Sequence, residues 1–287
     1  MKWFKQTKYV WPLVPAVLFV FIFVGYAIMM ALLESITING QWTLDAYKQL
    51  LENQSFRDSI LFSLKVTLTS TFISLFIGVV ITRWMYYYLR NYWVKVLIWI
   101  PMLFPHFVWG YIVILLFSQS GWFSGLLYEL GLLEDFTHFP VLTQDQHGIG
   151  IISTYIFKEV PFVILIILPV YIQMNHQYKH VVQTLGGSKW EIFKTVEWPT
   201  IFPVLSEAGI IIFAFVLSAF EVPFLLGATY PKMVSILSYD WFFQGDWSQR
   251  PMAFAAMIIV TSIIVICSIV LFSMTNRLRI RVSKGER

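Results

Sequence analysis

The chain alternates between long apolar runs and shorter polar segments. A helix needs about 20 residues to cross the hydrocarbon core of a bilayer, and six runs are long and apolar enough. They lie near residues 11–33, 60–81, 96–117, 149–172, 204–226 and 252–274. Because little sequence is left for a soluble domain, the pattern predicts an all-α integral membrane protein. We expect six transmembrane helices in a single domain covering residues 1–287.

Composition agrees with this pattern, since 58% of the 287 residues are hydrophobic and 13% are charged. The first apolar run exceeds twenty residues and has no small-x-small cleavage pattern after it, so it is interpreted as a retained span. The one cysteine, Cys267, lies inside the last run, which excludes a disulfide framework.

Lysine and arginine are concentrated in alternate polar segments, as they are on the cytoplasmic side of membrane proteins. On that side the sequence places Lys2, Lys5, Lys8, Arg83, Arg90, Lys95, Lys179, Lys189, Lys194, Arg277, Arg279, Arg281, Lys284 and Arg287. The opposite segments carry Lys48, Arg57, Lys232 and Arg250 among many acidic residues. The bias predicts that both termini and the segment 176–203 are cytoplasmic. Because the basic residues flank spans, no nucleic-acid partner is expected.

The segment 176–203 is polar and amphipathic between two apolar runs. A helix is expected over Tyr178–Leu185, and Gly186 and Gly187 would end it, because glycine adopts positive φ without penalty. Ser188 is a candidate N-cap of a second helix, with Glu191 completing a capping box. Trp190, Phe193 and Val196 follow at helical spacing, and Pro199 is expected to close the element.

This segment resembles the motif E-A-A-x3-G-x9-I-x-L-P of permease subunits of ATP-binding-cassette (ABC) importers. Gly186 stands at the motif glycine, Val196 at the isoleucine and Pro199 at the proline, whereas His180 replaces the motif glutamate. The neighbouring residues that also look like the family are Leu185, Gly187, Ser188, Trp190 and Phe193. The similarity extends over residues 55–275 and looks closest to permeases for polyamines, ferric iron, thiamine, sulfate and molybdate.

The resemblance implies a type I importer permease in the prokaryotic cytoplasmic membrane. Two ABC ATPases would dock on the coupling loop 176–203. A second permease, identical or homologous, would complete the pore. An external solute-binding protein would deliver a small nutrient. The chain itself is expected to be no enzyme and to bind no cofactor, with ATP and Mg²⁺ held by the ATPases. Either Glu191 or Glu197 could replace the missing motif glutamate, or the loop could be held differently.

Charged residues inside apolar runs usually face a cavity or a partner. Lys158 and Glu159 lie in one run, and Glu221 lies in another. Each of the two glutamates begins a copy of the tetrapeptide Glu-Val-Pro-Phe. Pro161 and Pro223 are expected to kink the helices beside their glutamates. One hypothesis is that these residues line the translocation path and suit a cation such as a polyamine. The alternative is that Lys158 and Glu159 are structural and that Glu221 pairs with a neighbouring subunit.

Other classes stay open from the sequence alone. An ion-gradient-driven transporter or channel would work without ATPases, and a membrane scaffold would not transport. No Gly-x4-Gly-Lys-Ser/Thr phosphate loop is present, so energy from ATP would need another subunit. His176 and His180 have the i, i+4 spacing of metal ligands but no third ligand nearby, so no metal site is expected.

Overall fold

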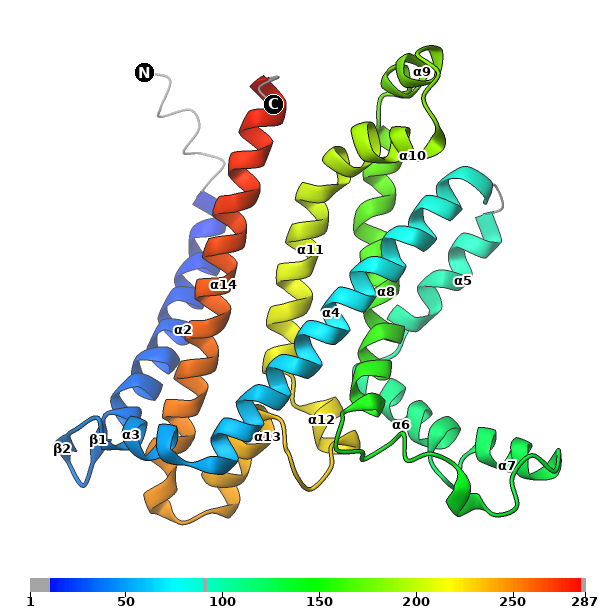
Figure 1. The fold of residues 1–287 in the computed structure, drawn as a ribbon. Coiled ribbons are helices and arrows are strands. Elements are labelled where there is room, and N and C mark those ends of the chain that lie inside the picture. The colour runs from blue at the N-terminus through cyan, green and yellow to red at the C-terminus, as the bar shows by residue number, and fades with distance from the viewer. Residues whose placement is uncertain (1–10, 90–91, 285–287) are drawn as a thin grey trace, which may run out of the picture. The chain divides into compact units, whose positions relative to one another are not determined.

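The computed structural model describes residues 11–89 and 92–284 (Figure 1). Lys2, Lys5, Lys8, Arg90 and Arg287, which entered the orientation argument, lie outside them. Among the described residues, six helical stretches are long and apolar enough to cross a membrane, as the sequence predicts. These candidate spans are Val14–Ser35, Gln54–Tyr88, His106–Glu129, Ile149–Gln173, Lys189–Ser218 and Trp247–Thr275.

The third predicted span is divided where the sequence has prolines. Helix α5 covers Tyr92–Leu103 and α6 covers His106–Phe117, with Pro105 as the N-cap of α6. A residue before proline is pushed out of the helical region, so Phe104 ends the first helix. The candidate span here begins at His106 and continues through α7, Trp122–Glu129. The single helix expected over 96–117 is therefore wrong.

The fifth predicted span, 204–226, is also divided. Helix α11 runs from Trp198 to Ser218, and the six-residue α12, Glu221–Leu226, follows after a break. The carbonyl of Ala219 accepts a hydrogen bond from Ser235 Oγ at 2.7 Å. This bond satisfies a backbone group that the helix leaves free, so the break is compatible with burial.

Contacts divide the chain into two compact units, and the first takes in Met1–Arg57 and Leu237–Thr261. Its described part begins with a 3₁₀ turn, Trp11–Leu13, and α2, Val14–Ser35. A two-stranded hairpin follows, β1 Thr37–Ile38 and β2 Gln41–Trp42, whose turn residues Asn39 and Gly40 have positive φ. Such a turn matches the right-handed twist of paired strands. The unit also contains α3, Asp45–Glu52. A π turn at Asp240–Gln244 and a 3₁₀ turn at Trp247–Gln249 lead into the start of α14, Arg250–Lys284.

The second unit takes in Asp58–Ile236 and Ser262–Arg287. Its core surrounds α8, Ile149–Gln173, the most buried candidate span among the described residues. Side chains of α4, Gln54–Tyr88, and of α11 pack on Tyr155, Val163 and Tyr171 of α8. A Cβ atom at Gly78 of α4 would overlap the Val163 side chain, so glycine permits close contact of α4 with α8.

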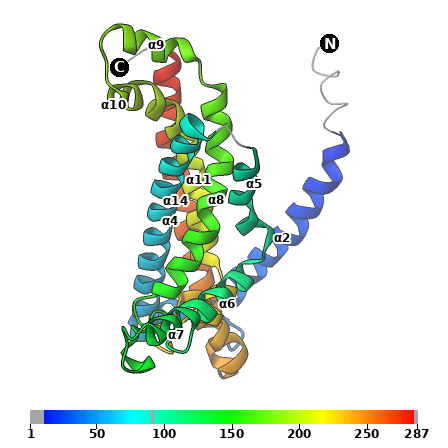
Figure 2. The ribbon, with the colours of Figure 1, turned by 90° about the vertical axis from the view of Figure 1, so that its right-hand side faces the viewer.

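Within this unit, helices α9, His176–Thr184, and α10, Lys189–Ile192, lie at one end of α8 (Figures 1 and 2). Helices α6 and α7 lie at the opposite end in both views, and α12 lies there in Figure 1. The unit also contains a 3₁₀ turn, Phe136–His138, and the start of α13, Val234–Tyr239. The loop that the sequence singles out therefore projects from one end of the bundle.

Candidate functional site

Local hydrogen bonds shape the α9–α10 loop, and the glycine stop among them is predicted by the sequence. Asn175 caps α9 by accepting a bond from the Gln177 amide at 2.9 Å. At the other end, Gly186 has a φ of +80°, and the Gly187 amide donates to the Val182 carbonyl at 2.9 Å. This is the left-handed helix stop for which glycine is favoured. The expected helix before Gly186 is confirmed.

The second helix of the loop begins with the expected capping box. The Glu191 amide donates to Ser188 Oγ at 3.3 Å, and the Ser188 amide donates to Glu191 Oε2 at 2.5 Å. The two reciprocal bonds fix the start of α10, and an acidic residue in the first turn suits the positive end of a helix.

A π turn, Phe193–Glu197, joins α10 to α11. Val196 is buried against the core around α8, and Phe193 stacks on Trp190 with ring centroids 5.4 Å apart. Pro199 is the second residue of α11, and the helical stretch continues across it from the π turn, although proline has no amide proton to donate there. The expectation that Pro199 closes the element is wrong, since α11 begins there.

The Glu197 carboxylate is fully buried and holds the loop to the spanning helices. Arg83 Nε donates to Glu197 Oε2 at 2.7 Å, and the Tyr87 hydroxyl donates to Oε1 at 2.5 Å. Tyr171 of α8 donates to Oε2 at 3.3 Å, and Lys179 Nζ lies 4.0 Å from Oε1. Side chains from α4, α8 and α9 thus converge on one acid.

These contacts answer the question left open by the missing motif glutamate. Glu191 caps α10, and Glu197 forms the tertiary contact. His180, at the motif position itself, is exposed, and its Nδ1 lies 3.3 Å from Gln183 Oε1 in the same helix. Sequence reasoning did not identify Arg83, Tyr87 or Tyr171 as members of this site.

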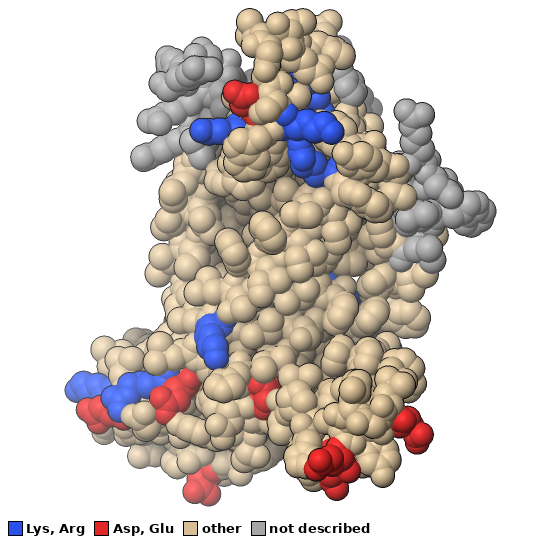
Figure 3. Space-filling view, turned by 45° about the vertical axis from the view of Figure 1, so that its right-hand side comes forward, with Lys and Arg blue, Asp and Glu red and all other residues tan. Residues whose placement is uncertain are grey.

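The loop exposes bulky apolar side chains among its polar ones. Leu185 is 83% exposed and Trp190 is 68% exposed, and Tyr178 and Val181 of α9 are also exposed. Lysine and arginine side chains gather around this end of the molecule (Figure 3). A capped loop with bulky apolar side chains directed outward is typical of a surface that docks a protein.

Lys158, a candidate for the translocation path, is bound to backbone carbonyls. Its Nζ donates to the carbonyls of Pro101 at 2.9 Å and Met102 at 3.2 Å, and also to that of Phe104. These carbonyls belong to the end of α5 and the break before α6, where the helix leaves acceptors unpaired. The ammonium therefore caps the end of α5.

The two candidate glutamates lie in different surroundings. Glu159 is buried, and its Oε1 lies 3.2 Å from Nε2 of His106, a partner that the sequence analysis missed. Glu221 is exposed at the first position of α12. The His106 ring lies 6.5 Å from that of the buried Tyr155, so Glu159, His106 and Tyr155 lie in one region.

The two prolines next to these glutamates have different surroundings. Helix α8 continues through Pro161 to Gln173. Pro223 is the third residue of α12, so the kink expected there is instead a break between α11 and α12.

Comparisons with known proteins give a consistent result. A family model described as "Binding-protein-dependent transport system inner membrane component" matches residues 74–284. The inner membrane ABC transporter permease protein YnjC of Escherichia coli is 31% identical over 149 residues, which is 51% of this chain and 27% of that protein. The sulfate transport system permease protein CysT of Escherichia coli is 25% identical over 225 residues, 76% of each chain. The thiamine transport system permease protein ThiP of Haemophilus influenzae is 25% identical over 248 residues, covering 85% of this chain and 42% of that protein.

The fold is also found in a solved transporter. A chain in the crystal structure of a bacterial ABC transporter that imports alginate matches with a TM-score of 0.79 and 18% identity, over 96% of this chain and 99% of that one. The chain spans about a quarter to just over half of the length of the first curated relatives, at 27%, 56%, 53% and 47%.

Proposed function

The chain belongs to the family of binding-protein-dependent transport system inner membrane components, and on this basis we propose that it is the permease subunit of an ATP-driven ABC importer. Six candidate spans among the described residues provide the membrane domain of a multi-pass inner-membrane protein. An external binding protein would deliver the nutrient, and a second permease, identical or homologous, would complete the pore.

The exposed apolar face of the α9–α10 loop is the observation that carries this proposal. Capping bonds at Asn175 and Ser188 and the buried Glu197 fix the loop, so little ordering entropy remains to be lost on docking. Leu185 is the most exposed large apolar side chain in it. Two ATPases would bind these loops and supply ATP hydrolysis with Mg²⁺, while this chain would remain without enzymatic activity.

We expect Leu185→Asp to abolish docking with the fold retained, because the side chain is 83% exposed and the charge would enter an apolar interface. ATP-dependent uptake in proteoliposomes containing the assembled transporter should fall about tenfold or more, the effect of losing one interface hot spot. Leu132→Asp, at a residue that is 69% exposed outside the loop, is the matched control. Undiminished ATP-driven uptake by the Leu185 variant, or gradient-driven uptake with no ATPase present, would argue for a secondary transporter.

For the substrate, a small cationic nutrient such as a polyamine or thiamine suits the candidate path residues best. Glu159 and Glu221 are the acidic side chains among them, whereas the Lys158 ammonium is bound to carbonyls. Relatives named for thiamine, sulfate and molybdate or tungstate transport include one cationic and two anionic substrate types. Iron and oxyanions are the other candidates.

Glu221→Gln tests the proposed path directly. Because Glu221 is exposed, loss of its charge should leave assembly unchanged. Uptake of a cationic substrate should fall about tenfold, which corresponds to the free energy of roughly one charged hydrogen bond. Transport in proteoliposomes would be measured together with co-purification of the ATPase. Normal uptake and normal assembly would remove Glu221 from the path.

A further inference from the structure

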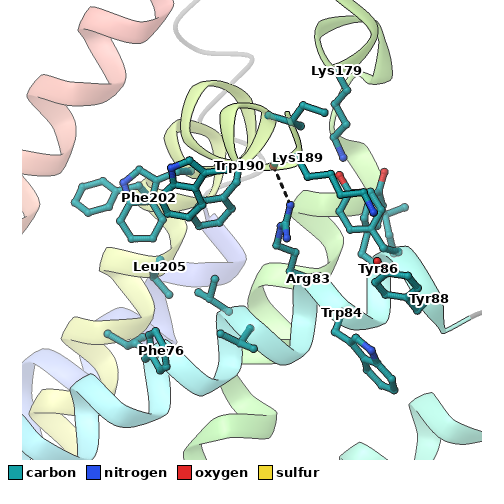
Figure 4. A pocket seen from close by; sticks show the side chains of 18 of the residues that line it. Phe76, Arg83, Trp84, Tyr86, Tyr88, Lys179, Lys189, Trp190, Phe202 and Leu205 are labelled. Carbon is teal, nitrogen blue, oxygen red and sulfur yellow. Dashed lines mark hydrogen bonds between the residues drawn. The ribbon is translucent and has the colours of Figure 1, made fainter. Parts of the chain in front are cut away.

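A groove with a volume of about 1330 Å³ opens between α4, the end of α8, the α9–α10 loop and α11. Figure 4 shows Phe76 and Leu205 at one end of this groove and Arg83, Lys179 and Lys189 toward the other. Leu185, Tyr178 and Val181 of the docking surface do not line this space, whereas Trp190 lies at its edge. The proposed function leaves it without an occupant.

One part of the groove is an apolar stripe on α4. Phe72, Phe76 and Val80 recur every four residues, are exposed, and line the groove. Arg83 follows on the same helix, 11 residues after Phe72. At 1.5 Å per residue the stripe is about 12 Å long, and Phe72 lies about 16 Å from Arg83 along the helix, close to half of the roughly 30 Å hydrocarbon core. The distance from Phe72 to Arg83 therefore matches one leaflet.

The other end of the groove is cationic. Among the described lining residues Arg83, Lys179 and Lys189 are basic and none is acidic. Lys179 is 6% exposed, and its ammonium has no hydrogen-bond acceptor. The nearest carboxylate, Glu197, is 4.0 Å away and already accepts bonds from Arg83 and Tyr87. Burial lowers the pKa of Lys179, which Glu197 only partly opposes. The Lys179 ammonium also lies over aromatic rings, 4.3 Å from the Tyr86 centroid and 5.1 Å from that of Tyr87. It therefore contributes positive charge from inside the protein, whereas the exposed Lys189 is the ammonium that an anion can reach.

We propose that this groove binds an anionic phospholipid, with its phosphate on Lys189, near the positive charge of Lys179, and an acyl chain along Phe72, Phe76 and Val80. Basic pockets between spanning helices are suited to anionic lipid headgroups. A soluble anion would leave the apolar stripe uncovered, and an apolar protein segment would leave the positive charge of the groove without a counter-ion. Trp84 and Trp190 at the rim fit the headgroup layer, where amphipathic rings collect.

A lipid in this position would connect α4 with α9 and α10, the elements that Glu197 already joins. It would therefore stabilise the loop that we propose as the ATPase docking surface. The lipid site itself requires only a membrane protein, so its test is independent of transport.

The test is native mass spectrometry and thermal unfolding of the full-length chain in mild detergent. Dioleoylphosphatidylglycerol is titrated against dioleoylphosphatidylcholine as the zwitterionic reference. We expect retained phosphatidylglycerol adducts and a higher unfolding midpoint with that lipid only. Lys189→Gln and Lys179→Gln should each weaken its apparent affinity about fivefold, the worth of one basic residue near an anionic surface. Lys194→Gln, an exposed lysine of the same loop that does not line the groove, should leave the affinity unchanged.

Several outcomes would overturn the proposal. Equal stabilisation by phosphatidylcholine would remove the role of charge, and equal stabilisation by inorganic phosphate would indicate a soluble anion. A second copy of the chain in place of the lipid adduct would make the groove a protein interface. Unchanged phosphatidylglycerol affinity in the Lys189 variant, whose side chain is exposed and whose substitution leaves the fold intact, would also contradict it.

Discussion

The Glu197 carboxylate has no exposed surface, and side chains from three helices reach it. Two of its oxygen contacts, with Arg83 and Tyr87, are at 2.7 Å and 2.5 Å. When one partner of a buried charge pair is removed, the other is left without compensation, which costs more than the pair contributes. The attachment of the α9–α10 loop therefore depends strongly on this one acid.

We predict that Glu197→Gln lowers the free energy of unfolding by about 3 kcal/mol, the typical cost of breaking a buried ion pair. Thermal unfolding in detergent would measure this effect. Glu134→Gln, which alters an exposed acid away from the loop, should change the midpoint little. Equal midpoints for wild type and the Glu197 variant would show that the loop is held by its apolar contacts.

The importance of Glu197 could not be derived from the sequence. The family motif directs attention to position 180, where a histidine stands, and treats position 197 as variable. Arg83 precedes Glu197 by 114 residues, and spacing gives no information on such a pair. By contrast, Ser188 and Glu191 are three residues apart, so their capping box could be predicted from local geometry alone.

At the scale of elements, the break between α5 and α6 is stabilised from a third helix. Pro101 O accepts from Lys158 Nζ at 2.9 Å and from Trp109 Nε1 at 2.8 Å. Carbonyls at a helix end within the membrane need such donors, because lipid offers none. The result supports the structural alternative for Lys158 that the sequence analysis left open.

Lys158→Met tests this role. The substitution keeps the length of the side chain but leaves the carbonyls of Pro101, Met102 and Phe104 without their charged donor. The free energy of unfolding should fall by about 3 kcal/mol, while uptake per folded molecule should change little. Lys65→Met, at an exposed lysine of α4, serves as the control. Lower uptake at unchanged stability would instead return Lys158 to the path.

Helix ends were the least predictable elements. Apolar length correctly predicted six candidate spans, but the third and fifth runs each contain a break. At Phe104 the following proline gave a local signal. At Ala219 the break is accompanied by a hydrogen bond from Ser235, sixteen residues away, which no local pattern contains. Hydropathy detects segments apolar enough to cross a membrane, but it does not detect which backbone groups find hydrogen-bond partners.

At the scale of the whole molecule, orientation in the membrane is still a prediction from charge. It places the α9–α10 loop in the cytoplasm and the segment after α7 outside. Within the second unit these parts lie at opposite ends of α8 (Figure 1). Leu185 and Leu132 are well exposed, at 83% and 69%, so each can report on its own side.

Cysteine labelling checks this orientation. In a Cys267→Ser background, which removes the one native cysteine, Leu132→Cys should react with a membrane-impermeant maleimide on intact cells. Leu185→Cys should react only after the cells are permeabilised. The opposite pattern of labelling would invert the topology and place the loop out of reach of any cytoplasmic ATPase.

The π turn at Phe193–Glu197 has a consequence for how this family can vary. A π turn closes its hydrogen bonds over one residue more than an α turn, so it holds one extra residue between two otherwise regular helices. Deleting one residue from Phe193 to Thr195 would turn it into an α turn and leave the rotational phase of α10 and α11 unchanged. Relatives that are one residue shorter here can therefore present the same faces of both helices. A comparison of loop lengths across the family should accept a one-residue difference at this turn as structurally neutral.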